Sequence, residues 1–74
     1  MRLGVHLQYL NKDYKFVYDF GQGYSFEGAE FMFTEGNYSC DCNKSVFIRQ
    51  FCDKDFPEMK CGEKIKLIKI WEER

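Results

Sequence analysis

The sequence predicts a small α+β domain, a strand-rich antiparallel sheet with one short helix in the order β-β-β-α-β. Aromatic residues make up 19% of the 74 residues and there is a single Ala, a composition that favours strands over a helix bundle. Apolar and polar residues alternate over the first 20 residues. After Ser45 the apolar spacing changes to three and four, the spacing of a helix.

The first two predicted strands form an antiparallel hairpin. Apolar side chains recur at every second position on both sides of a short polar connection at residues 11–13. These side chains are Leu3, Val5, Leu7, Tyr9, Tyr14, Phe16, Tyr18 and Phe20. They share one face of the hairpin, which we expect to supply half of the core.

A third strand is predicted over residues 29–33, where Ala29, Phe31 and Phe33 alternate with polar or flexible residues. It follows Gly21 and Gly23, two residues that accept positive φ and end the hairpin pattern. This interpretation places all three apolar side chains on one face of the sheet.

The predicted helix follows, with Phe47, Ile48, Phe51 and Cys52 on one side of it. Asn43 or Ser45 is the expected N-cap, and the apolar run at residues 46–48 would also suit a strand.

Residues 53–58 are expected to form a loop, because Pro57 interrupts regular structure. A last strand is predicted over residues 65–71, which are rich in β-branched side chains. Its alternation slips at Ile68, which indicates a bulge or a strand partly covered on both faces.

The length predicts one compact domain, residues 1–74, with no linker or repeat. A chain this short is close to the size at which one core barely offsets chain entropy, so support from a metal, a partner subunit or an unusually apolar core is expected.

Charge and hydropathy exclude several classes of function. The net charge is -1 with acidic and basic residues interspersed, so no basic stripe is expected for duplex nucleic acid. No apolar run approaches the roughly 20 residues that span a bilayer, and the start MRLGVHLQYL lacks the layout of a signal peptide. We therefore expect a cytoplasmic protein that does not bind membranes.

Four cysteines are the candidate metal ligands: Cys40, Cys42, Cys52 and Cys61. Four thiolates could close a tetrahedral zinc site and stabilise a marginal domain, and Cys61 precedes Gly62 as at the end of a zinc knuckle. The separation of Cys40 and Cys42 by one residue is less usual for zinc. Buried free thiols and disulfides are the alternatives.

The stretch EGNYSCDCNK, residues 35–44, is also a candidate anion site. It leads into the predicted helix, where free backbone amides favour an anion and basic side chains would add charge. The predicted ligand-binding residues are Glu35, Asn37, Tyr38, Asp41, Asn43, Lys44 and Arg49. The alternative is a helix whose Asp41 or Asn43 caps its own amides.

Catalysis is not predicted. His6 is the single histidine and lies on the strand face opposite the aromatic side chains. A carboxylate pair of Glu30 and Glu35 cannot be told from two solvated charges, and no phosphate loop or dinucleotide fingerprint is present. No cofactor is required by this interpretation, and zinc is the possible metal.

Eight aromatic residues between residues 14 and 33 exceed what one small sheet face needs. Either the sheet and helix enclose all of them, or another copy of the chain covers some. The second alternative predicts a homo-oligomer, with aromatic rings available to stack on a planar ligand.

Residues 34–44, TEGNYSCDCNK, resemble a motif of small, largely uncharacterised tailed-bacteriophage proteins, in which TEGN and CDCN are followed by a basic residue. That residue is commonly Arg in the family and is Lys44 here. The resemblance covers about 11 residues and extends to Cys61 and Gly62.

The resemblance implies a protein that acts on the host without catalysis, in the host cytosol. The first hypothesis is anti-defence by sequestration of a small anionic ligand, a nucleotide-type immune signal. The alternative is an interaction module, stabilised by zinc at the four cysteines, that binds and inhibits a host protein.

Overall fold

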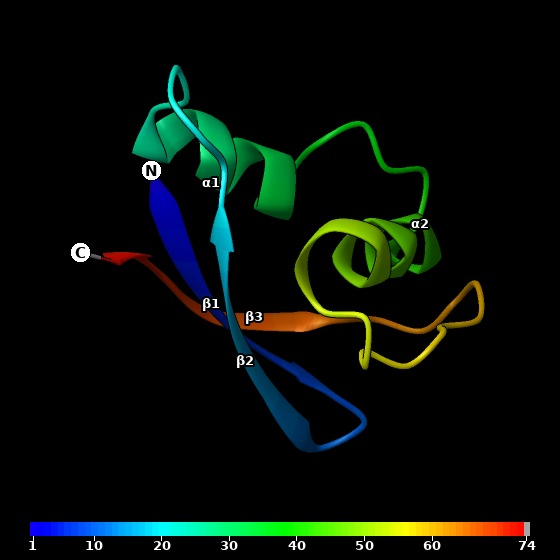
Figure 1. Cartoon of the computed structure of the whole chain (residues 1–74). Coiled ribbons are helices and arrows are strands. Elements are labelled where there is room, and N and C mark those ends of the chain that lie inside the picture. The colour runs from blue at the N-terminus through cyan, green and yellow to red at the C-terminus, as the bar shows by residue number, and fades with distance from the viewer. Residues whose placement is uncertain (74) are drawn as a thin grey trace.

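The computed structural model describes residues 1–73 and shows a three-stranded antiparallel sheet with its helices on one side (Figure 1). The elements are β1 (Arg2–Tyr9), β2 (Lys12–Asp19), α1 (Phe26–Thr34), α2 (Asp41–Phe47), the π-helical turn η1 (Ile48–Cys52) and β3 (Lys66–Glu73). The strand order is β2-β1-β3. The α+β class and the antiparallel sheet predicted from the sequence are confirmed.

The hairpin forms as predicted, with Arg2 opposite Asp19 and Tyr9 opposite Lys12. Its connection is shorter than expected: Leu10 and Asn11 both have positive φ, at 52° and 62°, and Lys12 already belongs to β2. Two successive left-handed residues make the turn that suits the twist of a two-residue hairpin.

The third predicted strand is wrong, because residues 29–33 lie within helix α1. Ser25 caps the helix by accepting a hydrogen bond from the Gly28 amide at 3.0 Å. Ala29 and Phe33 are buried at helical spacing, while Phe31 is 54% exposed. The alternation that predicted a strand was therefore a coincidence of composition.

The helix predicted after Ser45 is confirmed, but it begins earlier, at Asp41, and its predicted caps are wrong. The N-cap is Cys40, and both Asn43 and Ser45 lie within the helix. Ser45 is buried and its hydroxyl donates to the Cys42 carbonyl oxygen at 2.8 Å. Ile48 begins the π-helical turn that continues α2 to Cys52.

The last strand is confirmed, with the bulge predicted at Ile68. His6 lies opposite Lys69 and Leu7 lies opposite Leu67, so Ile68 has no partner on β1. The preceding loop is held to the core by Phe56 and Met59, both buried. Pro57 lies in this loop as expected.

The core lies between the inner face of the sheet and the helices. Its buried residues are Leu3, Val5, Leu7, Tyr9, Phe20, Ala29, Phe33, Ile48, Phe56 and Met59. Of the eight aromatic residues between 14 and 33, Tyr24 and Phe31 are the two that stay about half exposed. Most of the aromatic excess therefore fills the core, which supports a small domain.

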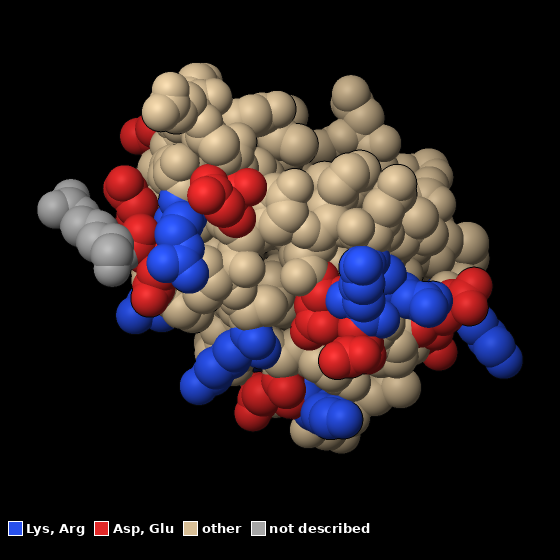
Figure 2. All heavy atoms as spheres, viewed as in Figure 1, with Lys and Arg blue, Asp and Glu red and all other residues tan. Residues whose placement is uncertain are grey.

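Acidic and basic side chains are interspersed on the face of the molecule seen in Figure 2, as the sequence predicts. Among residues 1–73, no helix has both the length and the apolar character needed to cross a bilayer.

We predict that Phe33→Ala lowers the free energy of unfolding by about 3–5 kcal/mol, because Phe33 is buried against Phe16 and Phe47. The matched control is Phe31→Ala in the same helix, which should change the free energy of unfolding by less than about 0.5 kcal/mol. Urea unfolding measures this free energy for both variants. Similar losses in the two variants would contradict the helical placement, because a strand would put both rings on one face.

Candidate functional site

Three cysteine sulfurs meet where the start of α2 faces the loop before β3. Cys40 and Cys42 form a disulfide, and the Cys61 Sγ lies 2.6 Å from the Cys42 Sγ and 3.4 Å from the Cys40 Sγ. The three Sγ atoms all lie within 4.8 Å of one another. Once the disulfide is reduced, these cysteines could hold a metal ion.

Contacts on the carboxyl side of Cys61 hold it in place. The Tyr9 hydroxyl donates a hydrogen bond to the Glu63 carboxylate, and the Ile65 amide donates to the Asp41 Oδ2 at 2.9 Å. The bond to Glu63, together with burial, raises the pKa of Tyr9 to about 12. The loop that carries Cys61 is therefore fastened to both β1 and α2.

Cys52 lies apart from this cluster. It ends the π-helical turn and packs against the core. Burial, with a smaller contribution from the Asp53 charge, raises the pKa of the Cys52 thiol to about 12. Of the four cysteines predicted as metal ligands, the structure brings together Cys40, Cys42 and Cys61 and leaves Cys52 outside.

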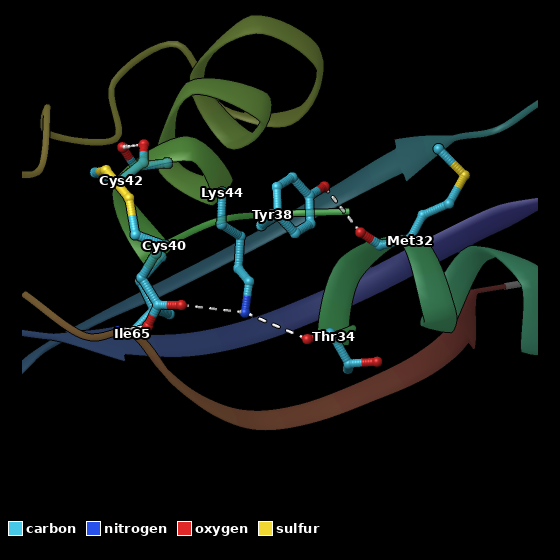
Figure 3. A network of polar contacts seen from close by, with 9 residues as sticks. Met32, Thr34, Tyr38, Cys40, Cys42, Lys44 and Ile65 are labelled. Atoms are coloured by element: carbon cyan, nitrogen blue, oxygen red, sulfur yellow. Dashed lines mark hydrogen bonds and ion pairs between the residues drawn. A yellow bond between two sulfur atoms is a disulfide. The ribbon is translucent and has the colours of Figure 1, made fainter. Parts of the chain in front are cut away.

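Two of the predicted ligand-binding residues, Asp41 and Lys44, make internal contacts, and Figure 3 shows those of Lys44. The Lys44 Nζ lies 3.4 Å from the Thr34 carbonyl oxygen and 3.6 Å from the Asp41 Oδ1. It also lies 5.9 Å from the centre of the Tyr38 ring. Its side chain is only 17% exposed. The ammonium group therefore joins the end of α1 to the start of α2.

The segment between the two helices uses further predicted residues for its own structure. The Tyr38 hydroxyl donates to the Met32 carbonyl oxygen at 2.8 Å, and burial raises the pKa of Tyr38 (Figure 3). The Asn43 side-chain amide donates to the Ser39 hydroxyl at 2.6 Å. Glu35 ends α1, and its side chain and that of Asn37 are exposed.

Arg49 lines a different part of the surface from Asp41. It borders a groove of about 590 Å³ with Val46, Gln50, Lys54 and Glu58, and its Nη1 lies 3.4 Å from the Glu58 Oε2. Asp41 instead lines a cavity of about 200 Å³ beside the cysteine cluster. Two of the seven residues predicted for one anion site, Asp41 and Arg49, thus line different parts of the surface.

A third group was missed by the sequence interpretation, which treated His6 as an isolated histidine. His6 lies opposite Lys15 on β2 and opposite Lys69 on β3, and Trp71 lines the same cavity of about 350 Å³. The pairing of His6 with Lys15 follows from the hairpin register alone. The contribution of β3 needed the long-range pairing.

Comparisons of this chain with protein-family models, with curated proteins and with solved structures gave no match.

We predict that, in the reduced protein at about pH 8, iodoacetamide modifies Cys61 much faster than Cys52. A thiol whose pKa is raised to about 12 has very little thiolate at this pH, and the thiolate is the nucleophile, whereas Cys61 is exposed. Peptide mass spectrometry over time measures the two rates. Equal rates would contradict the burial of Cys52.

Proposed function

We propose that this protein is a non-catalytic binding module whose fold is fastened by a zinc ion at Cys40, Cys42 and Cys61. The observation that carries the proposal is the convergence of these three sulfurs from two segments of the chain. Thiolate is a preferred ligand of zinc, and a metal is one of the ways in which domains of this size gain stability.

The position of Cys61 in the chain explains what the metal adds. The disulfide joins two cysteines separated by one residue, so it constrains little of the chain. A metal shared with Cys61 closes loops of 19 and 21 residues and holds the segment before β3 against α2. The metal-bound form is therefore the more strongly constrained one.

Metal binding requires the reduced protein. A thiol reductant supplies two electrons, with two protons, to convert the disulfide into two thiols. Zinc then displaces the thiol protons as it binds the three thiolates. The fourth position of a tetrahedral ion is left to water or to a side chain of a bound protein.

The surroundings of the cluster favour a stabilising metal over a catalytic one. Two carboxylates, Asp41 and Glu63, line the cavity next to the cluster. Asp41 accepts a hydrogen bond from the Ile65 amide at 2.9 Å. Glu63 accepts hydrogen bonds from the Tyr9 hydroxyl and, at 3.2 Å, from the Lys60 amide. A carboxylate engaged in this way is a poor general base for a metal-bound water.

The resemblance of residues 34–44 to small phage proteins suggests the partner, a host protein met in the host cytosol and inhibited by occupation of its surface. Sequestration of a nucleotide-type signal by the residues from Glu35 to Arg49 stays a prediction. The internal contacts of Asp41 and Lys44 favour the interaction module over that site.

We predict that the reduced protein binds one zinc ion per chain and that zinc raises its melting temperature, because the ion binds the folded state. Native mass spectrometry and thermal unfolding measure the two effects. Cys61→Ser should weaken zinc binding by more than the roughly 10- to 100-fold that loss of an outer contact causes.

The matched control is Cys52→Ser, which should keep the zinc stoichiometry and affinity of the native chain. Unchanged zinc affinity in Cys61→Ser, or an equal loss in Cys52→Ser, would show that the three-cysteine cluster is not the site.

A further inference from the structure

A row of three basic side chains crosses the face of the sheet that the helices leave open. His6 on β1 lies opposite Lys15 on β2 and opposite Lys69 on β3. Its neighbours in the chain, Val5 and Leu7, are buried in the core, so His6 points to the other face. Adjacent strands lie about 4.8 Å apart, which puts the two lysine backbones about 10 Å apart with His6 between them.

Lys15 and Lys69 are not directly opposite one another, because His6 on β1 lies between them. The His6 Nε2 lies 3.3 Å from the Asp13 Oδ1. Among residues 1–73, neither Lys15 nor Lys69 has a carboxylate oxygen within 4.0 Å. The two ammonium groups therefore offer positive charge that the described structure does not neutralise.

An indole ring lies directly beside the row. Trp71 is opposite Gly4 on the same face, and a Cβ atom at Gly4 would collide with the ring. The indole therefore covers bare backbone, and its N–H donates to the Glu73 Oε2 at 2.6 Å. The Lys69 Nζ lies 5.8 Å from the ring centre, so an anion held by Lys69 would lie next to the ring.

His6, Lys15, Lys69 and Trp71 together line a cavity of about 350 Å³. This volume is at the lower end of the range of roughly 300–1,000 Å³ for small-molecule sites. The cavity combines an aromatic ring for stacking with cations that suit phosphate oxygens.

We infer that the open sheet face is a binding site for a free nucleotide, with its base on Trp71 and its phosphate between Lys15 and Lys69. Two carboxylates flank the site, but both are engaged: Asp13 with His6 and Gln8, and Glu73 with the indole N–H. The site is separate from the cysteine cluster and does not depend on zinc. A nucleotide bound at this site would be a ligand in addition to the zinc ion and the protein partner of the proposed interaction module.

Trp71 is the only tryptophan in the chain, so its fluorescence reports on this site alone. We expect adenosine monophosphate to quench Trp71 fluorescence to saturation, because the base stacks on the indole. Adenosine should bind more weakly, since it lacks the phosphate. Inorganic phosphate should compete with the nucleotide without quenching the fluorescence. Added salt should lower the affinity for the nucleotide, because it screens the charge of the phosphate.

The test variant is Lys15→Gln with Lys69→Gln, which keeps the fluorescent reporter. This variant should lower the affinity for adenosine monophosphate by about tenfold or more, because it removes both cations that hold the phosphate. It should keep the melting temperature close to that of the native chain, because neither lysine has a carboxylate partner within 4.0 Å among residues 1–73. A structural role for the lysines would instead lower the melting temperature.

Two controls show whether a loss of affinity belongs to this site. Lys54→Gln with Lys60→Gln makes the same change of net charge away from the open face and should keep the affinity within about twofold. Asn37→Ala with Asn43→Ala changes the anion site predicted from the sequence, and this variant should also keep the affinity for adenosine monophosphate within about twofold.

Several results would overturn the inference: no quenching by adenosine monophosphate, an unchanged affinity in the Lys15 and Lys69 variant, or a loss confined to the Asn37 and Asn43 variant. Quenching by a short oligothymidylate but not by the mononucleotide would overturn it in favour of single-stranded nucleic acid. None of these results depends on zinc, so the proposed metal site stands or fails separately.

Discussion

Burial of the inner face of β1 under other elements organises the whole domain. Leu3, Val5, Leu7 and Tyr9 are all buried on this face, and among residues 1–73 β1 is the central strand, paired with β2 and with β3. In a chain of 74 residues few other side chains could replace this apolar surface. The helices lie on the same side of the sheet because this face has the apolar area to cover (Figure 1).

The metal cluster follows from the same packing. Phe56 is buried against the sheet and contacts the rings of Tyr9 and Tyr14, which holds the long loop to the core. Tyr9 continues this attachment through its hydroxyl, which bonds to Glu63 two residues after Cys61. Packing of the core thus places Cys61 next to the start of α2, and metal binding would stabilise an arrangement that packing has already formed.

The sheet also separates two kinds of chemistry. Its inner face is apolar and closed, whereas its outer face keeps Lys15, His6 and Lys69 in one row beside Trp71. Gly4 lets the indole lie against the backbone, where any larger residue would displace it. An anion bound between Lys15 and Lys69 would supply the carboxylate-like partner that neither lysine has within 4.0 Å among residues 1–73.

Local periodicity was enough to predict the hairpin, the helix after Ser45 and the last strand, and it indicated a bulge at Ile68 as one of two alternatives. It failed at residues 29–33, where Ala29, Phe31 and Phe33 fit a strand by alternation and the same segment fits a helix by burial at Ala29 and Phe33. The sites needed the tertiary structure. Which cysteines meet, and whether Lys44 faces a ligand or the Thr34 carbonyl oxygen, depends on contacts between segments far apart in the chain. The spacing of residues along the chain carries little information about such contacts, because packing of the core decides them.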